Sequence, residues 1–156
     1  MPAPAKRTLL RRLVDWSCDL NAAWRRVPQI EPLAALRLLH DEPANTIWID
    51  VRSEAEQQVS MIDRAWTAEQ ALARIEELQE NGDKQIVAYC TAGFRSGSFV
   101  AKLKRLGVPA QNLRGGLFAW CDAQGPLVDR DGKATRRVHT YAKYCQFVPD
   151  DYDPVA

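Results

Sequence analysis

Residues 86–97 carry the feature that most restricts the fold. A short apolar run, rich in β-branched and aromatic residues, ends at Cys90, and a tight segment with Gly93 follows. A helical pattern then extends from residue 96 to residue 106. The run is typical of a buried strand, and a strand that leads through a short loop into a helix is the repeating unit of a parallel α/β sheet.

The position of Cys90 also predicts reactivity. A cysteine at the carboxyl end of a strand, facing the start of a helix, meets converging backbone N–H groups and the positive end of the helix dipole. Both features lower the pKa of a thiol and stabilise an anion on its sulfur. Arg95 adds a positive charge that is not lost at physiological pH. The segment therefore suits a nucleophilic thiolate.

The same alternation of strands and helices extends from residue 30 to residue 123. Buried-strand patterns occupy residues 46–51 and 86–89, with a shorter one near 112–114. Helical patterns occupy residues 32–39, 67–80, 96–106 and about 117–123. The prediction is an α/β fold with a small, central, mainly parallel sheet covered by helices on both faces.

An amphipathic helix is predicted at residues 8–27, with Thr8 as its N-cap and Pro28 beyond its end. We expect its apolar stripe to pack on the main domain, and the alternative is a helix that binds a partner or a membrane. The stripe recurs at spacings of three and four residues and consists of Leu9, Leu13, Trp16, Leu20, Trp24 and Val27.

Composition excludes several classes of protein. The formal net charge is +1, with a pI of about 7.7, so the overall charge does not indicate binding to nucleic acid or to a membrane. The apolar runs are too short to span a bilayer, and no secretory leader is recognisable, so we predict a cytoplasmic protein. The cysteines form no CxxC pair and His40 and His139 are isolated, so we predict reduced thiols, no metal site and no cofactor.

The chain divides into three predicted segments: an N-terminal helical extension at 1–28, a main domain at 29–128 and a C-terminal tail at 129–156 that docks through its aromatic residues. Asp50 and Arg52 lie at the end of the strand predicted at 46–51. We interpret them as an ion pair that orders the loops around Cys90, in preference to direct catalysis.

Several short motifs follow one another over about residues 29–128. They are Ile30-Glu31-Pro32, Asp50-Val51-Arg52 with Glu56, Cys90-x-x-Gly93-x-Arg95-Ser96, Gly107, Gly115-Gly116-x-x-Ala119-Trp120 and Gly125-Pro126. Each motif alone is weak, but their order and spacing together are specific. On these motifs the chain resembles the rhodanese (sulfurtransferase) family.

The resemblance implies a rhodanese-like fold and a sulfurtransferase that needs no cofactor. Cys90 would attack the outer sulfur of a donor and hold it as a persulfide. The amides of the loop would stabilise this anion, while Arg95 would position an anionic donor or organise the loop, and Asp50, Arg52 and Ser96 would support the site. The residues of the predicted cradle are Thr91, Ala92, Gly93, Phe94 and Arg95.

Thiosulfate or a small persulfide is the expected donor, because the loop does not match the Cys-Gly-Ser-Gly-Val-Thr loop of the mercaptopyruvate enzymes. The expected acceptors are cyanide, a small thiol or a protein thiol. Cys18, Cys121 and Cys145 are interpreted as packing residues. The alternative is that Cys145 resolves the Cys90 persulfide as an internal disulfide.

Residues 60–65 depart from the family's Gly-His-Ile-x-Gly-Ala string and keep only Ile62 and Ala65. We expect this change to alter a turn and its packing, without altering the chemistry. Two other functions stay open: a non-catalytic rhodanese-like interaction module, and a cysteine phosphatase or arsenate reductase. Loops of the latter enzymes place one more residue between cysteine and arginine, which makes room for a tetrahedral oxyanion.

Overall fold

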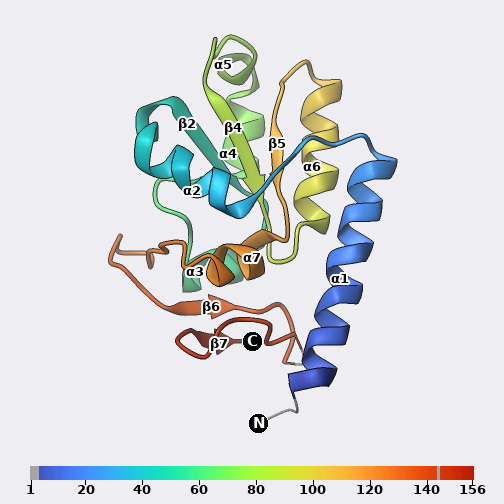
Figure 1. Cartoon of the computed structure of the whole chain (residues 1–156). Helices are drawn as coiled ribbons and strands as arrows, with labels where there is room; N and C mark the ends of the chain where they lie inside the picture. Colours follow the sequence, from blue (N-terminus) through green and yellow to red (C-terminus); the bar gives the residue numbers. More distant parts are fainter. Residues whose placement is uncertain (1–3, 144) are drawn as a thin grey trace.

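The computed structural model describes residues 4–143 and 145–156 and is built around a five-stranded sheet. All pairs in this sheet are parallel, in the order β1-β5-β4-β2-β3. The strands are β1 (Gln29–Ile30), β2 (Thr46–Asp50), β3 (Trp66–Thr67), β4 (Gln85–Tyr89) and β5 (Gln111–Leu113). The predicted small parallel sheet with helices on both faces is confirmed (Figure 1).

Helices connect the strands and precede them at the N-terminus. The helices are α1 (Pro4–Trp24), α2 (Pro32–Asp41), the short 3₁₀ helix η1 (Pro43–Asn45), α3 (Glu54–Val59), α4 (Ala68–Ala73), α5 (Ile75–Gln79), α6 (Phe94–Arg105) and α7 (Gly116–Asp122). The expected helix at 67–80 is two shorter helices, because Arg74 leaves the helical conformation at φ −112° and ψ 32°. Thr8 was wrongly expected to cap the first helix, which begins earlier, at Pro4.

The central strands are buried on both faces, and alternate residues enter two separate clusters. Ile49 and Ala88 face a cluster with residues of α1, α4, α5 and α6. Trp48 and Val87 face the opposite cluster, which holds residues of α2, α7 and the C-terminal tail. This two-sided burial explains why β2 and β4 are continuous apolar runs instead of alternating patterns.

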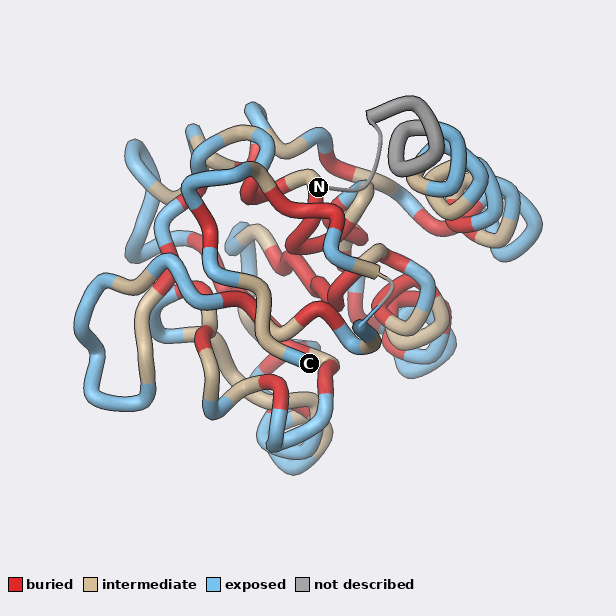
Figure 2. Tube along the Cα trace, turned by 90° about the horizontal axis from the view of Figure 1, so that it is seen from below, coloured by how far each residue is buried: buried red, intermediate tan, exposed pale blue. Residues whose placement is uncertain are grey.

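The apolar stripe of α1 does not pack on the domain, so that prediction is wrong for all its members except Val27. The helix rests at the margin of the molecule (Figure 1, Figure 2). It meets the domain through its opposite side, where Cys18 and Ala22 are buried, and small residues there let α1 lie close to α6. A Cβ atom added at Gly97 of α6 would lie 3.5 Å from Nδ2 of Asn21.

The C-terminal tail crosses the domain below the sheet (Figure 1) and contributes the parallel pair β6 (Arg137–His139) and β7 (Asp153–Val155). Val138, Phe147 and Tyr152 belong to the buried cluster on that side. The ring centroids of Phe147 and Phe118 lie 5.4 Å apart in an edge-to-face arrangement. The division into three segments stays a prediction, but these contacts place the tail beside α7.

The altered segment 60–65 forms an irregular turn. Its buried members connect it to the core: Ile62 donates its backbone N–H to the Tyr89 hydroxyl at 3.0 Å, and the carbonyl of Ser60 accepts from Arg52. Arg64, where the family's string has glycine, adopts a left-handed φ of 59°. An arginine in this conformation costs roughly 1–2 kcal/mol, so the departure from the family's pattern strains the backbone of this turn.

Candidate active site

Cys90 lies directly beyond β4 and is almost completely buried. The chain turns at Gly93, which has a φ of 102° and serves as the N-cap of α6. A Cβ atom at this position would meet the backbone nitrogen of Gly115 at 3.4 Å. Glycine therefore provides both the left-handed conformation and the close approach of the two loops.

One backbone donor and one side-chain hydroxyl lie at the sulfur of Cys90. The backbone N–H of Gly93 lies 3.1 Å from Sγ, and the Ser96 hydroxyl lies 3.4 Å from it. The one proton of that hydroxyl has its nearer acceptor in Oδ1 of Asn112, at 2.6 Å, and Asn112 Nδ2 donates to the Gly93 carbonyl at 3.2 Å. Asn112 on β5 therefore ties the end of one strand to the loop after its neighbour.

The loop between β5 and α7, at Gly115 and Gly116, packs against the Cys90 loop and hydrogen-bonds to it. The N–H of Leu117 donates to the Cys90 carbonyl at 2.9 Å, and that of Phe118 donates to the Thr91 carbonyl at 3.1 Å. Gly116 has a φ of 57°, and a Cβ atom there would lie 2.5 Å from the Cys90 carbonyl oxygen. The Gly-Gly pair is needed for this contact between loops, in addition to its turn before α7.

A buried carboxylate organises the other side of the loop. Arg95 forms a bidentate pair with Glu56, at 2.8 Å from Nη1 to Oε2 and 2.7 Å from Nη2 to Oε1. The Thr91 hydroxyl donates to the same carboxylate at 2.9 Å, and Ser53 donates to it from both its backbone and its side chain. Glu56 therefore fastens the Cys90 loop to the N-terminus of α3.

The electrostatics of this pair are strongly coupled. Burial alone would raise the pKa of Glu56, but the hydrogen bonds from Arg95 and Ser53 outweigh it and hold that pKa well below its usual value. The hydrogen bonds to Glu56 raise the pKa of Arg95 above its usual value, with a smaller contribution from Cys90. Both groups are ionised at neutral pH.

Glu56 should make stability depend on pH in the acid range. A carboxyl group with a depressed pKa stabilises the fold above its unfolded pKa, near 4.5, and loses this contribution as the pH falls through its folded pKa. We expect Glu56→Gln to lower the free energy of unfolding at pH 7 by roughly 1.5–3 kcal/mol and to flatten its decline below pH 4.5. Urea unfolding across this range measures both effects.

Glu54→Gln is the matched control, since Glu54 is an exposed residue of the same helix. We expect that variant to keep the acid-range decline of the wild type. A Glu56→Gln variant with an equally steep decline would show that another carboxylate is responsible for it.

Asp50 and Arg52 form a buried ion pair beside the site. Arg52 Nη2 lies 2.6 Å from Asp50 Oδ2 and also donates to the Ser60 carbonyl at 2.6 Å. Neither Asp50 nor Arg52 is among the described residues that line the cavity at Cys90. The pair connects the end of β2 to segment 60–65, which agrees with a role in ordering loops.

A cavity of about 290 Å³ opens over Cys90. Thr91, Ala92, Phe94 and Arg95 of the loop line it, together with Val14 of α1, Phe118 of α7 and residues of the tail. The tail residues are Thr140, Tyr141, Cys145 and Phe147. The guanidinium of Arg95 lies 5.1 Å from the centroid of the Tyr141 ring, so the tail forms one wall of the site.

The other three cysteines differ in their pKa and in whether they line this cavity. Burial, then the charge of Cys90, raises the pKa of Cys18 to about 11. Burial raises the pKa of Cys121 to about 12, and it also raises the pKa of Cys145. Cys145 alone among the three lines the cavity at Cys90. In the described parts of the chain, no cluster of three or more His, Cys, Asp or Glu side chains is placed to hold a metal ion.

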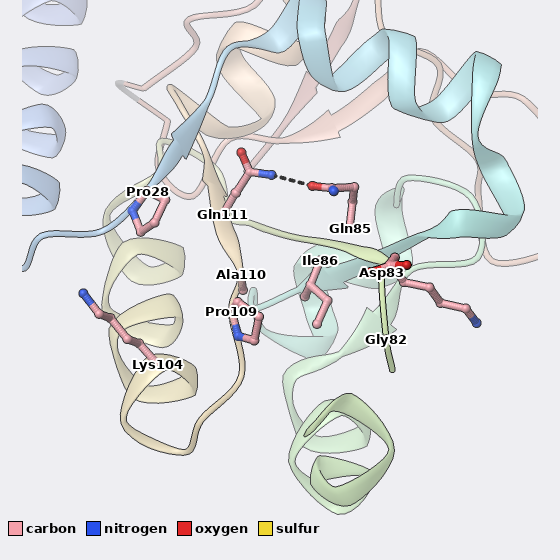
Figure 3. Close-up of a pocket in the computed structure, with 10 residues that line it drawn as sticks. Pro28, Gly82, Asp83, Gln85, Ile86, Lys104, Pro109, Ala110 and Gln111 are labelled. Atoms are coloured by element: carbon pink, nitrogen blue, oxygen red, sulfur yellow. Dashed lines mark hydrogen bonds between the residues drawn. The ribbon is translucent and has the colours of Figure 1, made fainter. Parts of the chain in front are cut away.

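A larger cavity, of about 440 Å³, lies at the opposite end of the strands. Its lining includes Gln85 and Gln111, the first residues of β4 and β5, whose side chains share a hydrogen bond of 3.0 Å (Figure 3). No cysteine or histidine is among the described residues that line it. Reactive groups of parallel sheets lie at the carboxyl ends of strands, so the smaller cavity at Cys90 is the candidate active site.

Comparison with known proteins agrees with this geometry. The model of the rhodanese-like domain family matches residues 32–123. The chain belongs to the rhodanese-like domain family. A sulfurtransferase of Allochromatium vinosum is 33% identical over 89 residues, which cover 56% of this chain and 83% of that protein.

Solved structures show the same fold at lower identity. The thiosulfate sulfurtransferase of Pseudomonas aeruginosa superposes with a TM-score of 0.58 and 21% identity, over 77% of this chain and 23% of that one. A Rhodopseudomonas palustris protein of unknown function, described as a possible tyrosine phosphatase, gives a TM-score of 0.57 and 20% identity, over 70% of this chain and 92% of its own. These two similarities concern the rhodanese-like fold alone.

The structure brings most of the predicted site residues together and adds others. Cys90, Gly93 and Ser96 meet at the sulfur, while Thr91 and Arg95 turn toward Glu56. Within the described residues, Gly93 provides the one loop amide that hydrogen-bonds the sulfur. Sequence reasoning matched Glu56 to the family's pattern without placing it in the site. It missed the lining or supporting residues Val14, Asn112, Phe118, Tyr141 and Phe147.

Proposed function

We propose that this chain is a sulfurtransferase that carries sulfane sulfur on Cys90. The Cys90 thiolate attacks the outer sulfur of thiosulfate or a small persulfide, and the bond between that sulfur and the rest of the donor breaks. Sulfite or a thiolate leaves with the bonding electron pair, and a persulfide anion remains on the enzyme. A thiol or cyanide then attacks the outer sulfur and restores the Cys90 thiolate.

The observation that carries this proposal is the N–H of Gly93 aimed at Cys90 Sγ at 3.1 Å, with the hydroxyl oxygen of Ser96 3.4 Å from the same sulfur. Both lie at the N-terminus of the twelve-residue helix α6, whose dipole favours negative charge. The same groups stabilise the thiolate before the attack and the persulfide after it. The family relationship and the Allochromatium sulfurtransferase support the same reaction class.

The cavity favours a donor with an organic group over thiosulfate. The Glu56 carboxylate already neutralises the charge of Arg95, through a bidentate pair. Side chains such as Val14, Phe118 and Phe147 make the wall beside it mostly apolar. A dianion therefore gains little attraction there, while an alkyl persulfide finds a matching surface. We therefore assign Arg95 mainly to loop organisation, one of its two predicted roles.

Arg95→Lys tests that assignment. Lysine keeps the charge but loses the planar fork that engages Glu56. If Arg95 organises the loop, kcat/KM should fall by about ten- to a hundredfold, and by the same factor with thiosulfate and with a small alkyl persulfide. Arg105→Lys, on an exposed position of the same helix, should leave both values unchanged. A loss confined to the KM for thiosulfate would assign Arg95 to donor binding instead.

Mass spectrometry of the purified chain tests the reaction class. After incubation with thiosulfate or an alkyl persulfide, the peptide that contains Cys90 should gain one sulfur atom, and cyanide should remove it. A peptide that never gains sulfur from either donor would favour the non-catalytic interaction module. Hydrolysis of an aryl phosphate without any sulfur uptake would favour a cysteine phosphatase.

A further inference from the structure

The exposed face of α1 is the largest feature that sulfur transfer leaves unexplained. Most surface helices turn their apolar stripe inward, but α1 turns it outward. The large apolar side chains on this face, with their exposed fractions, are Leu9 (62%), Leu10 (43%), Leu13 (54%), Trp16 (64%), Leu20 (55%) and Trp24 (87%). We call this row the exposed stripe. Contiguous apolar surface of this kind marks an interaction site.

The acidic residues of α1 are held away from the exposed stripe. The helix has two of them, and both pair with arginines on its inner side or edge. Asp15 lies 3.0 Å from Arg11, and Asp19 lies 2.7 Å from Arg114 of the main domain. Arg11 also pairs with Asp122, and Arg114 also pairs with Glu31, so this acidic charge is gathered on the domain side of α1, away from the exposed stripe.

Basic residues border the exposed stripe. Arg12 is exposed within the helix, one turn from Trp16. Beyond Trp24, a shallow hollow of about 420 Å³ is lined by Ala101 and four basic residues: Arg25, Arg26, Lys104 and Arg105. No acidic side chain is among the described residues that line this hollow. The apolar row therefore ends in a positively charged patch.

We propose that α1 lies flat on an anionic lipid surface, with the exposed stripe in the boundary between headgroups and acyl chains. A row of leucines and tryptophans bordered by arginine and lysine is the pattern of helices that lie in the membrane interface. The distance from Leu9 to Trp24 along a helix is about 22 Å, so the contact is a line parallel to the surface. Tryptophan favours this boundary, and the basic patch meets the anionic headgroups.

Charge favours a lipid surface over a second copy of this chain. A copy could cover the exposed stripe with its own, but it would bring the same bordering basic residues, while the two acidic side chains of its α1 pair with arginines on the inner side or edge of that helix. Like charges would then meet without compensation. An anionic membrane covers the apolar row and compensates the positive charge together. In the described part of the chain, no helix is long and apolar enough to cross a membrane.

Cosedimentation of the whole chain with vesicles tests the proposal. We expect binding to vesicles of equal parts phosphatidylcholine and phosphatidylglycerol, weakened by high salt, and little binding to pure phosphatidylcholine. The double variant Leu13→Gln, Trp24→Gln should bind at least about tenfold more weakly. Replacing Arg12 or Arg105 by Gln should weaken binding about fivefold each.

Matched controls show whether binding depends on this surface in particular or on any exposed leucine or arginine. Leu33→Gln removes a leucine of α2 that is 65% exposed. Arg130→Gln removes an exposed charge from the segment between α7 and β6, which lies away from α1 (Figure 1). Both should bind like the wild type, and all variants should keep the thermal midpoint of unfolding because the replaced side chains are exposed. Equal binding by stripe and control variants would overturn the proposal.

Two further outcomes would also overturn it. Absence of binding to the anionic vesicles at low salt would remove the lipid surface as the occupant. A dimer in analytical ultracentrifugation that the double variant converts to monomer, without vesicle binding by the wild type, would make the exposed stripe an interface between copies. Neither outcome touches the sulfur-transfer proposal, whose readout is the persulfide on Cys90.

Discussion

Cys90→Ser should abolish sulfur transfer while leaving the protein folded. Serine is nearly isosteric with cysteine, and its hydroxyl can still accept the N–H of Gly93 in the buried site. It forms neither a thiolate near neutral pH nor a persulfide, so no covalent intermediate is possible. We expect kcat to fall by about four orders of magnitude or more, as for other lost nucleophiles. Cyanide-dependent thiocyanate formation and circular dichroism measure the two parts of this prediction.

Cys145→Ala is the informative control, because Cys145 lines the same cavity. If it only packs there, turnover and the lifetime of the Cys90 persulfide should stay unchanged. A persulfide that survives much longer in this variant would instead give Cys145 the resolving role. Retained turnover in Cys90→Ser would rule out Cys90 as the nucleophile.

The parts of the site that sequence could predict are those that are local in the chain. Cys90, Gly93 and Arg95 lie within one strand–loop–helix segment, and the chemistry follows from their order. Glu56 and Asn112 reach the same loop from α3 and β5, through contacts that span 39 and 19 residues with Arg95 and Gly93, respectively. They reach this one loop because parallel strands end at one edge of the sheet, and a single sequence does not give the register that brings them there.

The fold was predictable from the alternation of strands and helices, whereas the orientation of α1 was not. Periodicity shows that Leu13, Trp16 and Leu20 share a face, but it does not say what that face meets. Here Cys18 and Ala22 allow closer packing on the domain, and ion pairs such as Asp19–Arg114 fix that side of the helix. The most apolar face was therefore wrongly expected to be the buried one.

The second large effect is expected on stability, from the buried pair of Asp50 and Arg52. Both side chains are inaccessible to solvent, and the Arg52 guanidinium also satisfies the Ser60 carbonyl. Arg52→Met keeps the apolar stem but leaves the buried Asp50 carboxylate without its arginine, with the backbone N–H of residue 52 still donating to it. Removing one member of a buried pair costs about 3–5 kcal/mol, a large share of the stability of a domain of this size.

Urea unfolding of Arg52→Met against Arg137→Met measures this cost, since Arg137 and Asp153 form an exposed pair 3.7 Å apart. The exposed pair should contribute at most about 1 kcal/mol. Adding Asp50→Asn to Arg52→Met should recover part of the lost stability, because the uncompensated buried charge is then removed. Equal costs for the two arginine variants, with no recovery in the double variant, would mean that water reaches the Asp50 carboxylate and that the loops around Cys90 are ordered by other contacts.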